Sequence, residues 1–218
     1  MKPKLFEVDI VMNALRRKRA VFHSEADFQF AFAWETKLIY QQVEVRLETH
    51  PRDHPQLRLD LQILDIANGD LIAIELKYLT RAWSGIDELA RDEAFELKNH
   101  GAHDHRRYDV VKDIHRIERF IQADPSWRGF AVVISNDAAY WEQPIGLVQS
   151  NDAAFRIHDG ASLSGDRKWA AQTASTKDRY TTLGLGGRYL LKWIDYSKVD
   201  ATSAGTFRSL TVPILRSP

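Results

Sequence analysis

Asp60, Glu75 and Lys77 are the residues whose types and spacing are best suited to chemistry. Hard divalent cations such as Mg²⁺ bind oxygen ligands, commonly one or two carboxylates together with water and a substrate phosphate. A metal held there acidifies water and stabilises charge on a phosphoryl oxygen. A lysine beside it can orient the attacking water. These side chains, if they converge, predict hydrolysis of a phosphodiester bond.

A predicted β-hairpin brings these three side chains to one face. Strands are expected over residues 57–64 and 71–78, and the Asn-Gly pair between them strongly favours a two-residue turn. In that register Asp60 lies directly across from Lys77, and Glu75 lies two residues from Lys77 on the same face. The opposite face is apolar and contains Leu59, Leu61, Ile63, Ile74, Leu76 and Tyr78. The simplest alternative is a solvated hairpin face with an Asp60–Lys77 ion pair, worth at most about 1 kcal/mol.

The Glu-x-Lys tripeptide also occurs at residues 35–37 and 96–98, so it has little specificity by itself. Residues 35–37 fall in a predicted helix, where side chains two positions apart do not face each other. Residues 96–98 have no predicted hairpin partner that supplies an aspartate to the same face. Asp65, an alternative ligand, points away from Glu75 in the predicted register. Asp60 is therefore the expected partner of Glu75.

The pattern Asp60-x14-Glu75-Leu76-Lys77 across a β-hairpin resembles the signature of the PD-(D/E)xK nuclease superfamily, which has the restriction-endonuclease-like fold. That family has an αβββαβ core, and the resemblance covers about residues 20–135. Its first helix often carries a glutamate that joins the metal site, and Glu25 stands at the matching place. Leu59 replaces the proline that names the motif, which is a common variation.

The resemblance implies a metal-dependent nuclease that acts on DNA, with RNA as an open alternative. Asp60, Glu75 and Glu25 would hold Mg²⁺, with Mn²⁺ as a substitute, and Lys77 would orient the attacking hydroxide. The helix after the motif commonly carries basic residues near the substrate. Here these would be Arg107, Lys112 and Arg116, although Lys112 and Arg116 are equally able to pair with Asp109 and Asp113 on their own helix. Many relatives act as dimers or in prokaryotic defence systems, which makes a homodimer an expectation.

The other predicted elements agree with an α/β fold in which helices flank a central mixed sheet. Helices are expected at about 9–19, 24–39 and 104–122, the second opened by a capping box of Ser24 and Asp27. Further strands are expected at 41–48, 95–98 and 129–135, with turns near 83–85 and 184–187. Strands at 189–193 and 207–215 form a β-rich C-terminal extension over about residues 136–218. We expect residues 1–218 to form one nuclease-like domain.

Composition sets broad limits on the function. The chain has 218 residues, 44% of them hydrophobic, and no cysteine, which excludes disulfides, thiol catalysis and iron–sulfur clusters. No apolar run approaches the roughly 18 residues of a membrane-spanning helix, and no secretion signal is evident, so a cytoplasmic protein without membrane contact is expected. Net charge is zero, but residues 155–218 contain 10 basic and 5 acidic side chains.

Two other functions also agree with the sequence. The first is a non-catalytic nucleic-acid-binding or protein-interaction module that keeps this fold and uses the basic C-terminal segment, where aromatic and basic residues alternate; burial of these aromatics in a core is the competing interpretation. The second is a hydrolase with a histidine-bound metal around His100, His103, His105 and His115. The basic run at residues 16–19 is either a phosphate contact or a solvated helix end.

Overall fold

The chain is described by a computed structural model that covers residues 5–51, 58–87, 92–145, 150–214 and 216. It is a mixed α/β structure whose centre is a six-stranded sheet of order β1-β2-β3-β6-β10-β9. These strands are β1 (Val43–Thr49), β2 (Leu59–Asp65), β3 (Leu71–Leu79), β6 (Trp127–Ser135), β9 (Trp193–Lys198) and β10 (Thr206–Ile214). β3 and β6 are parallel, whereas the other neighbouring strands are antiparallel.

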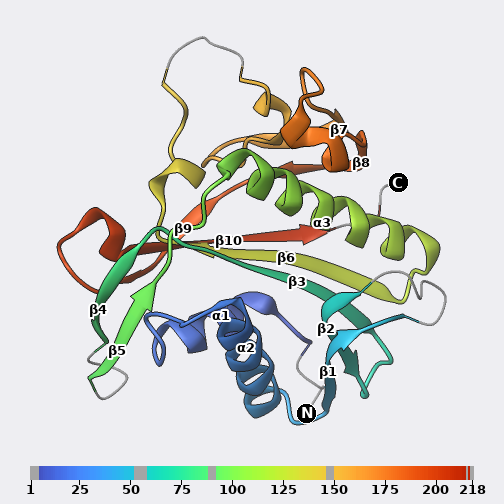
Figure 1. Cartoon of the computed structure of the whole chain (residues 1–218). Coiled ribbons are helices and arrows are strands. Elements are labelled where there is room, and N and C mark those ends of the chain that lie inside the picture. The colour runs from blue at the N-terminus through green and yellow to red at the C-terminus, as the bar shows by residue number, and fades with distance from the viewer. Residues whose placement is uncertain (1–4, 52–57, 88–91, 146–149, 215, 217–218) are drawn as a thin grey trace.

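Helices cover both faces of this sheet (Figure 1). α1 (Val8–Arg16) and α2 (Glu25–Ile39) lie on one face, and α3 (His103–Ala123) lies on the other. α3 packs closely on β6 at Gly129, where an added Cβ would collide with the Ile117 side chain. The face toward α1 and α2 buries Leu61, Ile63 and Ile74, as the alternation of the hairpin predicts.

Two smaller hairpins complete the fold. β4 (Trp83–Asp87) pairs with β5 (Glu93–Leu97) at one end of the sheet, and β7 (Ser162–Arg167) pairs with β8 (Leu183–Leu190) on the outer side of α3 (Figure 1). The element order is therefore two helices, three strands, a hairpin, helix and strand, followed by the C-terminal strands. Within the described ranges, no helix is long and apolar enough to cross a membrane.

The register predicted for β2 and β3 is wrong by two residues. Leu61 pairs with Ile74, not with Leu76. The turn is longer than two residues because the Asp65 carboxylate accepts a hydrogen bond from the Ala67 N–H at 3.0 Å and the Asn68 side chain accepts one from the Asp70 N–H at 3.0 Å. These local bonds close a loop over residues 66–70 in which Gly69 adopts a positive φ of 78°.

Two predicted turns are strands. Residues 83–85 lie in β4, because Trp83 packs edge-on against Phe207 and donates a hydrogen bond to Asp200 at 2.7 Å. Residues 184–187 lie in β8, where Glu118 of α3 accepts hydrogen bonds from the backbone N–H groups of Gly186 and Gly187 at 3.1 and 2.7 Å. Glycine at these positions permits the close approach of Glu118, so it does not mark a turn. Residues 189–193 join β8 to β9 instead of forming one strand, whereas β10 agrees with the strand predicted at 207–215.

The capping box at the start of α2 is half confirmed. The Ser24 hydroxyl accepts a hydrogen bond from the Asp27 N–H at 3.2 Å. The Asp27 carboxylate accepts from the His23 N–H at 2.9 Å instead of from Ser24. α2 therefore begins at Glu25, and this start places the Glu25 side chain at the end of the helix that approaches β3.

Candidate functional site

The candidate site lies where β2 and β3 separate. Their paired register runs from Leu64 and Leu71 to Leu61 and Ile74. Beyond this paired segment, side-chain carboxylates accept the hydrogen bonds of β3 N–H groups that a neighbouring strand would otherwise accept. Asp60 Oδ2 accepts a hydrogen bond from the Leu76 N–H at 2.7 Å, and Glu25 Oε2 accepts one from the Tyr78 N–H at 3.1 Å. Since alternate N–H groups of a strand point to the same edge, both carboxylates lie along one edge of β3.

Glu75 and Lys77 meet α3 on the other face of the hairpin. Lys77 Nζ lies 3.1 Å from Asp113 Oδ2 and 3.9 Å from Glu25 Oε1. Arg116 forms a close ion pair with Glu75 and lies 3.1 Å from Asp113 Oδ1. The Glu75 and Asp113 side chains are 2% and 9% exposed, so these charges interact largely out of water.

The resulting cluster has more negative than positive charge. Its four carboxylates are Glu25, Asp60, Glu75 and Asp113, and its two cations are Lys77 and Arg116, which leaves a formal charge of −2 when all are ionised. Such an excess of charge in a buried site raises carboxyl pKa values until a proton or another cation compensates for it.

The pKa shifts agree with this charge imbalance. Burial, followed by the Asp113 and Asp60 charges, raises the pKa of Glu75 well above its usual value. Burial also raises the pKa values of Asp60 and Glu25, and Lys77 reduces both shifts without cancelling them. Burial lowers the pKa of Lys77, but the surrounding carboxylates outweigh it and the net shift is upward. Lys77 is therefore a protonated hydrogen-bond donor at neutral pH.

The structure brings together Asp60, Glu75, Lys77 and Glu25, the four residues predicted for the site. It adds Arg116, which was predicted to contact nucleic acid or to pair on its own helix, as a partner of Glu75. It corrects the partner of Lys77: the paired register ends at Leu61 and Ile74, Asp60 bonds the Leu76 N–H, and the shortest ion pair of Lys77 is with Asp113. Asp113 itself was not predicted as a site residue. Its signal is its position three residues before Arg116, on the same face of α3.

Two of the basic residues predicted on α3 lie outside the cluster. Arg107 is buried, pairs with Asp152 at 2.7 Å and donates to the Ala139 carbonyl at 2.9 Å. It is therefore not placed to contact a nucleic-acid backbone. Lys112 is exposed on the surface of α3. Arg116 does pair with Asp113, which was one of its two predicted roles.

The histidines do not form a second centre. His103 contacts Asp137 at 2.7 Å, while His100 accepts a hydrogen bond from the Thr80 N–H at 3.3 Å, so the two have separate partners. Among the described residues, no group of three or more His, Asp or Glu side chains is arranged to hold a metal ion as it stands, and the carboxylate cluster is no exception. In that cluster, Lys77 and Arg116 lie against the carboxylates.

The cluster nevertheless has the chemistry of a hard-cation site. All four acidic donors are carboxylate oxygens, which Mg²⁺ and Mn²⁺ prefer, and a divalent cation matches the charge of −2. Binding through Glu75 requires Arg116 to release that carboxylate. Arg116 is 22% exposed, so it has solvent into which to move.

Glu25 and Lys77 open into a cleft of about 500 Å³ bounded by the start of α2, the end of β3, β5 and the start of α3. Lys98, His100 and Arg106 are among the other basic residues that line it. Burial lowers the pKa of His100, which is therefore neutral at pH 7. The cleft thus joins the carboxylate cluster to cationic side chains that suit a phosphate-bearing ligand.

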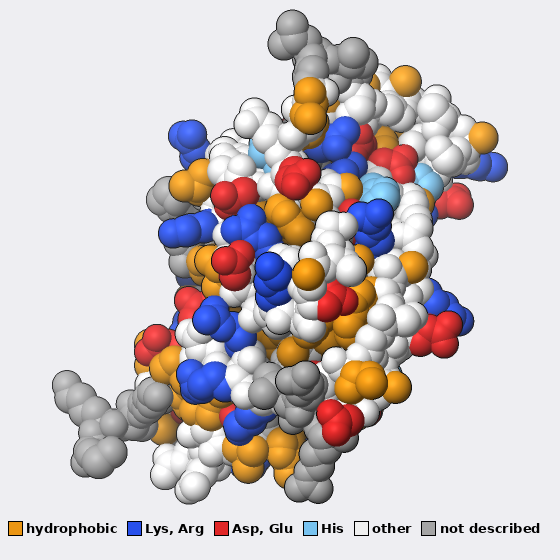
Figure 2. Space-filling view, turned by 90° about the vertical axis from the view of Figure 1, so that its left-hand side faces the viewer, with side chains coloured by type: hydrophobic (Ala, Val, Ile, Leu, Met, Phe, Trp, Pro, Cys, Tyr) orange, Lys and Arg blue, Asp and Glu red, His pale blue; other side chains and the backbone are white. Residues whose placement is uncertain are grey.

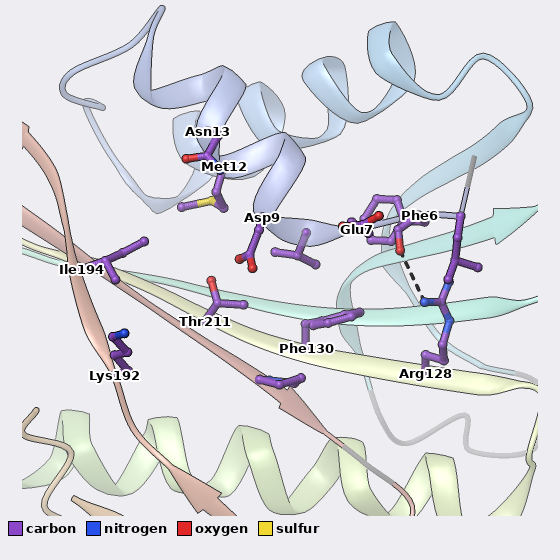
Figure 3. Close-up of a pocket in the computed structure, with 13 residues that line it drawn as sticks. Phe6, Glu7, Asp9, Met12, Asn13, Arg128, Phe130, Lys192, Ile194 and Thr211 are labelled. Carbon is purple, nitrogen blue, oxygen red and sulfur yellow. Dashed lines mark hydrogen bonds between the residues drawn. The ribbon is translucent and has the colours of Figure 1, made fainter. Parts of the chain in front are cut away.

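A separate cavity of about 450 Å³ lies between α1 and strands β6, β10 and β9 (Figure 3). Phe6, Met12 and Phe130 line it, and Arg128 donates a hydrogen bond to the Phe6 carbonyl at 3.3 Å. None of its lining residues belongs to the carboxylate cluster. This cavity is therefore distinct from the candidate site.

The basic run and the C-terminal aromatic residues are largely structural. Arg16 donates to the Asp195 carbonyl, Lys18 pairs with Glu35, and Arg19 pairs with Asp27. The C-terminal aromatics buried in the two cores are Trp169, Tyr189, Trp193 and Tyr196. Figure 2 shows one end of the molecule, where Lys and Arg side chains alternate with Asp and Glu. The structure thus favours the core interpretation of these aromatics over a stacking surface.

Comparison of the chain with protein-family models, curated proteins and solved structures finds no match.

Proposed function

We propose that the protein is a metal-dependent nuclease with a restriction-endonuclease-like fold that hydrolyses phosphodiester bonds, with DNA as the preferred substrate. The observation that carries this proposal is the group of four carboxylates, two charges in excess of its cations, around a protonated Lys77 at the separation of two strands. The order of α2, β1, β2, β3, α3 and β6 supports it, because it matches the αβββαβ core with one hairpin inserted.

Asp60 and Glu75 would hold Mg²⁺ or Mn²⁺, with Glu25 as a further ligand or support. The ion supplies a lowered pKa for bound water and charge stabilisation on the phosphoryl oxygen. Glu25 and Asp60 are held in place by the backbone N–H groups of Tyr78 and Leu76, so both have an oxygen atom at a defined position before any ligand binds. Such positioning lowers the cost of assembling the site.

Lys77 acts as a donor and not as a base, since its raised pKa keeps it protonated. Asp113, at 3.1 Å, fixes its ammonium group between β3 and α3. From there Lys77 orients the attacking water and stabilises negative charge on the phosphate. Water adds to phosphorus, the bond to the 3′ oxygen breaks, and that oxygen takes up a proton, which leaves 5′-phosphate and 3′-hydroxyl ends.

Direct metal binding tests this proposal. Isothermal titration of the purified protein with Mg²⁺ or Mn²⁺ is expected to show binding that Asp60→Asn and Glu75→Gln abolish. Asp65→Asn is the matched control, because Asp65 is the last residue of β2 and accepts a hydrogen bond from the Ala67 N–H instead of joining the cluster. Metal binding that is equal in wild type and Asp60→Asn contradicts the assignment.

A non-catalytic nucleic-acid-binding module is the second candidate. The observation that favours it is that Arg116 already pairs with Glu75, while Asp60 and Glu25 accept backbone hydrogen bonds, so the cluster has partners without metal. Such a module binds DNA or RNA in EDTA and loses affinity steeply with salt. Binding of that kind, combined with no metal-dependent cleavage, would replace the nuclease proposal with this one.

A further inference from the structure

The outer face of α2 carries an exposed apolar ridge. Phe30, Trp34 and Leu38 are 63%, 71% and 54% exposed, and they follow one another at intervals of four residues along the helix. The opposite side of the helix buries Phe28 and Phe32 completely. Single exposed apolar residues are ordinary, but a contiguous row on one helix face is typical of an interaction surface.

Shallow grooves flank this ridge on both sides. One, of about 460 Å³, lies between α2 and the end of α1, and the other, of about 570 Å³, lies between α2 and β1. Phe30 and Trp34 line both grooves. The surface therefore has a ridge of large side chains with a depression on each side, which is the shape required for packing against a surface of the same kind.

Most of the charged residues beside the ridge have partners of opposite charge within the chain. Lys18 pairs with Glu35, and Arg19 pairs with Asp27, both at 2.7 Å. Lys37 donates to backbone carbonyls at the end of α2. A strongly acidic or basic partner would find its counter-charges already paired here. An identical surface, by contrast, brings only the charge of Lys37, whose bonds are to backbone carbonyls, against this one.

We propose that this α2 surface is the interface of a two-fold symmetric homodimer. In a symmetric pair the same surface meets itself, so the ridge of each copy packs into a groove of the other. Ridges made of residues four apart favour helices crossing at about −50°. Trp34 then lies near the symmetry axis, and Phe30 faces the partner's Leu38.

The exposed area agrees with a modest dimer interface. At about 150–250 Å² for each fully exposed aromatic side chain, Phe30 and Trp34 expose roughly 200–330 Å², to which the half-exposed Leu38 adds. A stable interface buries about 800 Å² per partner, of which a central apolar group commonly provides the core. The groove walls and the rim of paired charges supply the remainder.

Sedimentation velocity over a range of protein concentrations tests this proposal. Wild-type protein is expected to reach twice the mass of one chain at micromolar concentrations, whereas Trp34→Glu stays monomeric. Because each copy contributes Trp34 to a two-fold interface, the substitution removes this side chain from both sides. The dissociation constant of the dimer is therefore expected to rise about 1,000-fold. Leu190→Glu is the matched control, since Leu190 is an exposed apolar residue on β8, away from α2, and its variant should remain dimeric.

Several outcomes would overturn the proposal. A wild-type protein that stays monomeric at the highest soluble concentration refutes it, as does a Trp34→Glu variant that dimerises like wild type. Vesicle co-sedimentation that Trp34→Glu abolishes, with a monomeric wild type, would assign the ridge to a membrane surface instead. Circular dichroism shows whether each variant is folded, and folding is expected because Trp34 is largely exposed.

Discussion

Replacement of Lys77 by methionine would separate the electrostatics of the candidate site from its packing. Methionine has nearly the same length and keeps the apolar contacts of the lysine stem, but it removes the positive charge. The four carboxylates would then share only Arg116, and the formal charge of the cluster would change from −2 to −3. We expect the Lys77→Met variant to be less stable than wild type at neutral pH when no divalent cation is present.

The distances give the size of this effect. At an effective dielectric constant of about 20, attraction to Asp113 at 3.1 Å is worth about 5 kcal/mol, and attraction to Glu25 at 3.9 Å about 4 kcal/mol. The cost of removing the ammonium group from water offsets much of this gain. Breaking a buried pair nevertheless costs about 3–5 kcal/mol, and because Lys77 is 20% exposed we expect a loss of about 3 kcal/mol.

The pH dependence of this loss has a defined sign. Without Lys77 the already raised pKa values of Glu25 and Asp60 rise further, so the folded state holds protons more tightly than the unfolded state. The loss is therefore absent below the ordinary carboxyl pKa, and it develops as pH rises through the raised folded values. Saturating Mg²⁺ at about 100 times its dissociation constant should restore about 2.7 kcal/mol.

Urea unfolding at pH 5 and pH 8, with and without Mg²⁺, measures these quantities. Lys112→Met is the control, because Lys112 is exposed on α3 and its replacement should change the free energy of unfolding by less than about 0.5 kcal/mol. If Lys77→Met is as stable as wild type at pH 8 without metal, the carboxylates do not depend on Lys77 and the electrostatic reasoning fails.

Three further perturbations test individual contacts. Asp60→Asn keeps an oxygen that can accept from the Leu76 N–H, so in chemical denaturation it should be more stable than Asp60→Ala by about 1 kcal/mol. Both variants should lose metal-dependent cleavage. Equal stabilities of the two variants would show that the hydrogen bond to Leu76 does not stabilise the fold. Glu75→Gln removes an acid whose folded pKa is raised, so its unfolding free energy relative to metal-free wild type should increase as pH rises above about 4.5. A decrease over that range in the same titration would reverse the sign that we assign. Arg107→Met should cost about 3 kcal/mol in thermal or urea unfolding, because it leaves the buried Asp152 with only Arg156 and the Ser150 hydroxyl as partners. Cleavage per folded molecule should be unchanged, and its loss in folded protein would mean that Arg107 belongs to the substrate site.

The site could be predicted despite an error in the register. The predicted pairing of β2 and β3 differs from the observed pairing by two residues, and an even shift leaves the paired side chains on their predicted faces. Leu59, beyond the paired segment, is the exception, because it packs in the core on the α3 side. Glu75 and Lys77 therefore share a face as expected, and Asp60 still reaches the edge of β3 beside Leu76. Local alternation of apolar residues was sufficient for this part of the fold.

Contacts that depend on how distant elements pack could not be predicted. Asp113 enters the site only because α3 crosses above β3, and nothing in its own sequence neighbourhood specifies that crossing. The same holds for Arg107, whose partner Asp152 lies forty-five residues away. Glycines in β8 resembled a turn because their function is to admit Glu118. Local signals cannot distinguish these uses of the same residue.

The most direct test of the central claim is cleavage by the purified protein. Supercoiled and linear DNA would be incubated with wild type and with Lys77→Met, in Mg²⁺, in Mn²⁺ and in EDTA. The nuclease assignment predicts cleavage by wild type in either metal, none in EDTA, and none by the folded Lys77→Met variant. Cleavage that persists in the Lys77→Met variant, or an intact substrate with wild type in both metals, would contradict it.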